Sequence, residues 1–549
     1  MPLSSNIKIQ QANYFYNYTA GLNIGKIDLL KTATKLIKSK ISKVVYFSDL
    51  KAIYIDEQGN TKLEWITPQG RHWDKSWKID FKNKLPDYAK EEIALCLQMH
   101  FHEQRIEGNE GGTTAPYLRA QLPPIVLEDE NHALPVFPYL KLYANGLMTI
   151  SFQLDSTWEN LPEQPFIDST VNLFQYYFKK IWVKAELQRI DGELLLRSAF
   201  ENEISIGGKN IANRKTRQLI KKMRKDSKAT LEKSLTKTPK RFELNNEYWD
   251  LHQIAGSEDQ QHWESTIETC RSIYVNAISS LIVETIKRSR NFDVEVILWQ
   301  GRPSVSLMRF LDQPHSKDIL IERFEKSISR ILMRSPEVKD PPRLPPDLRP
   351  FEDYSFFGNR SLLLWIWVPR HDAPKDAWED ENTMSNLLES QSRAEHFEYY
   401  NMLIARACAI ANSPQSDEQL ISAYETLASA EAIVHQSSRA GEITEALEYL
   451  LNAAGTLGLI ASGKEQARWH LDERRFRNEI QRGRTDRLLT TVFGFVGAAG
   501  LADLVIKPIL KASQPAWQEW IIGLTAFFIA SLTVGIITTT TWLTSKFRK

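Results

Sequence analysis

Two charged side chains interrupt an apolar stretch near the carboxyl end of the chain. Asp503 and Lys507 are four residues apart within Leu488–Leu510, a spacing that puts both on one face of a helix. Repeated around the axis of an oligomer, such a carboxylate would favour cations in a pore. The alternative is an ion pair within one helix, with the lysine extended toward the membrane interface.

A histidine-rich sequence resembles a metal site at first sight. His100, His102 and Glu103 lie close together, but residues i and i+2 of a helix point in different directions, so we expect surface histidines. The three cysteines form no CxxC pair, which argues against structural zinc or a disulfide framework. No histidine lies in a recognisable Ser or Cys nucleophile motif. We predict that the protein is not an enzyme and has no metal ligands.

The segment Lys209–Arg241 is strongly basic, with 13 basic residues against two acidic ones. It predicts an electropositive surface for the phosphates of a nucleotide or nucleic acid. A solvated helix or loop, and contact with an anionic membrane surface, are the alternatives. No aromatic residue interrupts the run, which disfavours a stacking platform for single strands. The candidate ligand-binding residues are Arg214, Arg217, Lys221, Lys222, Arg224 and Lys225.

The stretch that contains Asp503 is the first half of an expected membrane hairpin. Trp520–Leu543 has 24 residues and no charged side chain. As a helix it would extend about 36 Å, enough to cross a bilayer core of about 30 Å. Leu488–Leu510 is the weaker span, because charged residues interrupt its far end. A buried hairpin of a soluble protein is the alternative.

Basic residues flank the expected spans on one side of the membrane. They are Arg482, Arg484 and Arg487 before the first span, and Lys546, Arg548 and Lys549 after the second. The positive-inside rule places both termini in the cytoplasm. We therefore predict a bacterial inner-membrane protein with two spans.

A solvated stalk helix is expected to lead into the first span. Lys464–Arg487 carries eight basic and five acidic residues, with a seven-residue pattern through Trp469, Phe476 and Ile480. Steps of three and four residues let parallel copies of one helix meet face to face, and glycines allow close approach in lipid. We predict a homo-oligomer in the lipid bilayer. The expected pore-lining residues are Arg487, Thr490, Gly494, Gly497, Leu501, Asp503 and Leu504, although Asp503 lies one step off the pattern.

The rest of the chain predicts an α+β cytosolic domain. Its 69 basic and 68 acidic residues nearly balance, so no overall polyelectrolyte partner is implied. Helical periodicity covers Ile27–Ile41, Pro86–His102, Phe166–Val183, Trp263–Lys287, Ser316–Met333, Asn382–Asn412 and Tyr449–Ala461. Hairpins are expected around Asp56–Asn60, around Asn145-Gly146 as a type I′ turn, and around Gln300–Pro303. Ser361–Val368 is expected to be a central strand, and Ser416 with Gln419 a helix cap.

The predicted domains follow from these elements. They are a cytosolic α/β domain at 1–335 containing the basic segment 209–241, a Pro-rich linker at 336–350, a strand segment at 351–380, a helical region at 381–463, a stalk helix at 464–487 and a transmembrane hairpin at 488–549, with spans at 488–510 and 520–543.

This organisation resembles the CorA superfamily, funnel-shaped pentameric metal-ion channels whose first transmembrane helix lines the pore. The resemblance covers Asn382–Lys549 in organisation and only the fold class before that. The family's Gly-Met-Asn tripeptide is expected between about Leu504 and Gln514, where this chain reads LVIKPILKASQ. The resemblance therefore does not extend to magnesium selectivity.

The missing tripeptide and the enlarged amino-terminal body are similar to the CorA-like effectors of type III CRISPR defence. That resemblance implies a nucleotide messenger, an adenylated S-adenosylmethionine, and a role for Arg214–Lys225 in phosphate binding. We predict an oligomeric channel or transporter for cations, including a divalent cation, gated by its cytosolic domain in antiviral defence. The alternative is a membrane-anchored sensor or nucleic-acid-binding effector that acts on the membrane without selective conduction.

Overall fold

The chain forms two compact units, Met1–Glu465 and Gln466–Lys549. The computed structural model describes residues 7–69, 79–107, 114–129, 132–154, 160–173, 176, 178–188, 238–253, 267–285, 296–349, 354–368, 381–414 and 416–547. The first unit mixes helices with one large sheet, and the described part of the second is helical. The α+β class is therefore confirmed.

The first unit is organised around one long strand, β1 (Lys8–Leu22). It pairs with β8 (Leu147–Leu154) along one edge and with β13 (Val296–Gln300) and β14 (Pro303–Phe310) along the other. The sheet runs in the order β11-β12-β10-β6-β7-β8-β1-β14-β16-β15.

The remaining strands extend this sheet on both sides of β1. They are β2 (Val44–Phe47), β3 (Lys51–Ile55), β4 (Thr61–Trp65), β5 (Tyr117–Gln121), β6 (Ile125–Glu128), β7 (Ala133–Tyr143), β9 (Leu161–Pro162), β10 (Lys180–Val183), β11 (Lys240–Leu244), β12 (Glu247–Gln253), β15 (Tyr354–Gly358) and β16 (Leu363–Trp367). The prediction at Ser361–Val368 is confirmed, because β16 is buried and pairs on both sides, parallel with β14 and antiparallel with β15.

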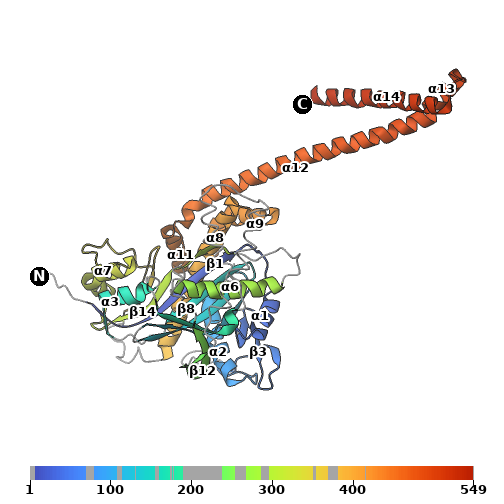
Figure 1. Cartoon of the computed structure of the whole chain (residues 1–549). Coiled ribbons are helices and arrows are strands. Elements are labelled where there is room, and N and C mark those ends of the chain that lie inside the picture. The colour runs from blue at the N-terminus through green and yellow to red at the C-terminus, as the bar shows by residue number, and fades with distance from the viewer. Residues whose placement is uncertain are drawn as a thin grey trace. The chain divides into compact units, whose positions relative to one another are not determined.

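The helices of the first unit cover both faces of the sheet (Figure 1). Those described are α1 (Leu29–Lys38), α2 (Asp87–Glu107), α3 (Glu163–Phe166), the π-helix η1 (Ile167–Val171), the 3₁₀ turn η3 (Ala185–Gln188), α6 (Ile267–Thr285), α7 (Lys317–Met333), α8 (Glu381–Asn412), α9 (Asp417–Ala428), α10 (Ala430–His435), α11 (Gly441–Ala453) and the start of α12 (Thr456–Leu501). The serines at 316 and 416 cap α7 and α9 by accepting a hydrogen bond from the backbone N–H three residues on, as expected at 416.

The two faces of β1 differ in chemistry, because alternate residues of a strand point to opposite sides. Tyr14, Tyr16 and Tyr18 join the apolar core that α1, α6 and α7 cover. The opposite face presents Asn17 and Thr19, which are buried but hydrogen-bonded. α8 crosses this polar face, so charged and amide side chains lie between helix and sheet.

The hairpin predicted around Gln300–Pro303 is wrong. β13 and β14 run in the same direction and pair one after the other with β1, where Thr19 opposes Gln300 and Tyr16 opposes Pro303. A Cβ at Gly301 would lie 2.0 Å from the carbonyl oxygen of Asn17. Glycine is therefore needed for close backbone approach to β1 and not for a reversal.

Three other predictions need correction. β7 and β8 form the predicted hairpin, but only Gly146 (φ 85°) has a positive φ, whereas a type I′ turn needs two such residues. The helix predicted at Phe166–Val183 ends early, and its last residues form β10 against β6. The helix predicted at Tyr449–Ala461 is split by a turn at Gly455 (φ 80°) between α11 and α12.

The second unit consists of the rest of α12, the π-helix η5 (Ala502–Ile506), α13 (Lys507–Ser513) and α14 (Glu519–Phe547). Its buried centre is four alanines, Ala498 and Ala502 against Ala526 and Ala530. Small residues let two helix backbones approach closely in lipid. Among the described residues, one helix is long and apolar enough to cross a bilayer, and this is α14 over Glu519–Ile536.

Candidate functional site: the C-terminal helical hairpin

The acidic residue predicted to line a pore lies in an irregular helical turn. Asp503 is in η5, and its side chain is 74% exposed in the single chain. Lys507 Nζ lies 3.3 Å from Asp503 Oδ1, which forms the intrahelical pair that was the alternative prediction. Since a pair at the surface of one chain is worth about 0–1 kcal/mol, it leaves the carboxylate available for other partners.

The other predicted pore-lining residues lie on one continuous helical path. Leu501 ends α12 and is 39% exposed, and Leu504 in η5 is 81% exposed. The remaining positions are in the helical backbone of α12 (Arg487, Thr490, Gly494 and Gly497). Steps of three and four residues put such positions on one side of a helix. Their role as pore-lining residues stays a prediction.

The stalk segment of α12 has large apolar side chains in solvent. Trp469, Phe476 and Ile480 are 58%, 64% and 43% exposed in the single chain. They are seven and four residues apart, the spacing of a coiled-coil seam. Charged neighbours such as Arg475 and Arg477 are exposed too, so this is a solvated helix with an apolar stripe.

The basic segment lies almost wholly outside the described residues, and so do all six candidate ligand-binding residues (Arg214, Arg217, Lys221, Lys222, Arg224 and Lys225). Only its end is described, in β11. There Lys240 lies over the rings of Trp182 and Phe242, and Arg241 pairs with Asp250 at 2.9 Å.

The surface location predicted for His100 and His102 is wrong. Both side chains on α2 are buried, with 6% and 8% of their surface exposed. They do diverge: His100 Nδ1 is 2.8 Å from the hydroxyl of Tyr117, and His102 Nε2 is 3.3 Å from that of Ser385. No group of three or more His, Cys, Asp and Glu side chains suited to a metal ion occurs among the described residues.

Glu103, the third residue of that motif, belongs to a buried cluster of four charges. The other members are Arg119 on β5, Lys141 on β7 and Glu395 on α8, and the two basic residues pair with both carboxylates. Lys141 Nζ lies 2.8 Å from Glu103 and 3.6 Å from Glu395. Burial acts to raise the pKa of Glu103, but Arg119 and Lys141 together hold it well below its usual value. The cluster joins α2, two strands and α8 in one electrically balanced unit.

No pattern in the sequence predicted this buried charge cluster. Its members come from four elements, and Glu395 is 276 residues from Arg119. In the sequence, each of these residues is indistinguishable from any other polar residue of a helix or strand.

Comparison with family models, with curated proteins and with solved structures found no match to this chain. The CorA resemblance therefore rests on the arrangement of its segments.

Proposed function

We propose that the protein is a homo-oligomeric membrane channel of CorA-like architecture, in which the stalk and first span from several copies surround an ion path. The apolar stripe of α12 carries this proposal. Burial of one large apolar side chain contributes about 1.5–3 kcal/mol, and Trp469, Phe476 and Ile480 have no such burial within one chain. Parallel copies would bury them along a common axis.

The charged residue in the hairpin supports the same arrangement. A charge facing lipid at the centre of a span costs about 2.5–3.5 kcal/mol on insertion scales. Asp503 lies toward the end of its span and would meet only part of this cost in lipid. It would avoid the cost on a water-filled axis, where charged side chains of membrane helices are usually found. A ring of these carboxylates would favour cations.

The hairpin also supports a membrane location. Only 17% of the Glu519–Ile536 window is buried, whereas a core helix of a soluble protein would be mostly covered. Trp517 and Trp520 are exposed at its beginning, as aromatic residues are at membrane interfaces. With Leu488–Leu510 as the other span, both termini would be in the cytoplasm of a bacterial cell.

Regulation by a nucleotide messenger belongs to this proposal. Its phosphates would meet the basic residues between Arg214 and Lys225, as the resemblance to type III CRISPR-associated effectors implies. Release of a permeant cation, monovalent or divalent, through the pore would then follow detection of infection.

Conductance in planar bilayers tests the proposal. We expect discrete single-channel steps from the purified full chain and a cation preference from reversal potentials in asymmetric salt. Reconstituted protein that gives no discrete steps, with or without nucleotide, would contradict it.

A membrane anchor is the second candidate function. It is favoured by the finding that, of the described helices, only α14 is long and apolar enough to span a bilayer. An anchored sensor or nucleic-acid-binding effector would carry no selective current. Nucleic-acid binding by the basic segment would weaken steeply with salt and on loss of the Lys221 and Lys222 charges.

A further inference from the structure

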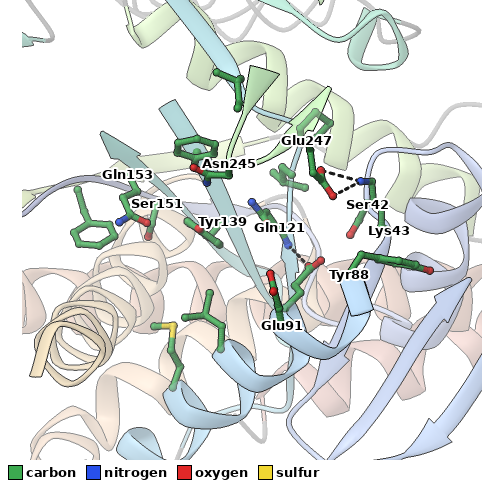
Figure 2. Close-up of a pocket in the computed structure, with 18 of the residues that line it drawn as sticks. Ser42, Lys43, Tyr88, Glu91, Gln121, Tyr139, Ser151, Gln153, Asn245 and Glu247 are labelled. Atoms are coloured by element: carbon green, nitrogen blue, oxygen red, sulfur yellow. Dashed lines mark hydrogen bonds and ion pairs between the residues drawn. The ribbon is translucent and has the colours of Figure 1, made fainter. Parts of the chain in front are cut away.

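The first unit contains a cavity of about 480 Å³ beside the polar side of the sheet. Its walls come from α2, α8, the turn before β2 and strands β5, β7, β8 and β12. In Figure 2, Tyr139 and Gln121 lie near the middle of the cavity. Ser151 and Gln153 lie at one end of it, and Lys43, Tyr88 and Glu247 lie at the other. The volume is within the range of about 300–1,000 Å³ that small-molecule sites have.

A carboxyl group without a charged partner, that of Glu92, lines this cavity. Glu92 Oε1 accepts a hydrogen bond of 2.9 Å from the backbone N–H of Gln121, and the other oxygen has no hydrogen bond within the described chain. Burial raises the pKa of Glu92 to about 8. At neutral pH the group is therefore a carboxylic acid that presents an O–H donor beside a carbonyl acceptor.

Two more uncharged polar side chains face the cavity without partners. The hydroxyl of Tyr139 and the amide of Gln153 make no hydrogen bond to any described residue. Both side chains are half-buried at the cavity wall. A ligand that hydrogen-bonds to them would take the place of water there, and it would need donors and acceptors.

The charges of the cavity are at its edges. Lys43, Lys40 and Glu91 are exposed at the opening, where Lys43 Nζ lies 2.8 and 2.9 Å from the two carboxylate oxygens of Glu247. Glu395, which α8 contributes to the lining, is paired within the buried charge cluster. Leu95, Met99, Leu387 and Leu388 supply the apolar walls. Lys184, a further cation of the lining, is half-buried and donates from Nζ to the backbone carbonyl of Lys40 at 2.9 Å. The charges that act on Glu92 itself are those of Lys43 and Glu247, which pair with each other. Around Glu92 the cavity therefore offers an ionic ligand no unpaired counter-charge, and it suits a neutral ring.

We propose that this cavity binds a small uncharged ring compound that carries a carboxamide or lactam group. Such a group has an N–H donor next to a C=O acceptor, so it pairs with the carboxylic acid of Glu92 through two hydrogen bonds, while Oε1 keeps its bond to Gln121. Tyr139 and Gln153 satisfy further polar atoms of the ligand. The site is independent of whether the hairpin conducts ions.

Matched pairs of neutral and anionic ligands test this class. Isothermal titration calorimetry on the full chain in detergent would compare nicotinamide with nicotinate and benzamide with benzoate, and include uracil as a lactam. We expect at least one neutral compound to bind at millimolar concentration or tighter, and its anionic counterpart at least tenfold more weakly. Binding by none of the neutral compounds, or equal binding of a neutral compound and its anion, would overturn the proposal.

Two substitutions of nearly unchanged size then locate the ligand. Tyr139→Phe removes one hydroxyl and should weaken binding about fivefold, whereas Tyr248→Phe, which alters a tyrosine 69% exposed on β12, should not change it. Equal affinity in Tyr139→Phe and the unaltered chain would contradict the location.

Glu92→Gln keeps a donor and an acceptor but cannot ionise. Affinity should fall as the pH rises through about 8 in the unaltered chain and stay constant in Glu92→Gln. The titratable groups facing Glu92 are Lys43, Glu247, Tyr88, Tyr139 and Cys96, and burial raises the pKa of the last three away from this range. The same pH profile in both proteins would show that Glu92 does not hold the ligand.

Discussion

The two longest helices place their side chains in opposite ways. α8 buries Gln391, Glu395 and Glu398 against the sheet, and α12 exposes Trp469, Phe476 and Ile480. These three polar side chains of α8 find partners inside the chain, in the buried charge cluster, in Asn17 and in Arg302. The apolar stripe of α12 finds no burial there. The contrast indicates that α8 holds one chain together. Under our proposal, the stripe of α12 is buried against a second copy.

The largest effect should follow from removing a charge that α8 contributes to the buried charge cluster. Glu395→Ala leaves Arg119 and Lys141 with only Glu103 as counter-charge in a buried site. Loss of one partner from a buried ion pair costs about 3–5 kcal/mol, so we expect a fall of that size in the free energy of unfolding, measured by urea denaturation. Glu425→Ala, on the exposed face of α9, is the control and should change it by less than about 0.5 kcal/mol. A loss below about 1 kcal/mol for Glu395→Ala would mean that the cluster is not a stabilising unit.

The next largest effect should follow from removing the apolar stripe of α12. The double change of Trp469 and Phe476 to Asp should remove the apolar stripe and add repulsion between copies, and so reduce the oligomer to monomers. At about 1.5–3 kcal/mol for each lost burial, the dissociation constant should rise at least about a hundredfold. Light scattering after size exclusion measures the mass. Arg475→Ala, which alters an exposed residue of the same helix, should leave the mass unchanged.

The element types that local residues determine were predictable, and the pairings that depend on distant strands were not. The cap at Ser416 and the helix α7 followed from nearby residues. The finding that β13 and β14 run in the same direction did not follow from nearby residues, because both strands pair with β1, almost 300 residues away. The cavity was not predicted for the same reason. Glu92, Tyr139 and Gln153 come from three different elements, and none of them stands in a sequence pattern that indicates a binding site.

The cavity allows a finer comparison within the first unit, between a carboxyl that is paired and one that is not. Glu92 binds its proton in the folded chain up to about pH 8 but loses it near pH 4.3 when unfolded. The folded state thus holds more protons between these values, and stability should fall as the pH rises from about 5 to 8. Relative to Glu92→Gln, we expect a loss on the order of 2 kcal/mol in the free energy of unfolding. Parallel stability curves for the two proteins over this range would contradict the neutral carboxyl.

The smallest effect concerns the Asp503–Lys507 pair of the hairpin. Asp503→Asn should lower the preference for cations, and Lys507→Gln should raise it, because the carboxylate then loses its intrahelical partner. Reversal potentials in asymmetric KCl measure both shifts, which we expect to be a few millivolts and of opposite sign. Shifts of the same sign would indicate that neither side chain faces the ion path.

We propose that the apolar stripe of α12 joins copies of this chain around one axis. Native mass spectrometry of the full chain, released from detergent micelles, counts the copies in the assembly. We expect one dominant oligomer, with five copies as the CorA resemblance implies, and its loss when Trp469 and Phe476 become Asp. A chain that stays monomeric in detergent and in lipid nanodiscs would show that the stripe does not join copies.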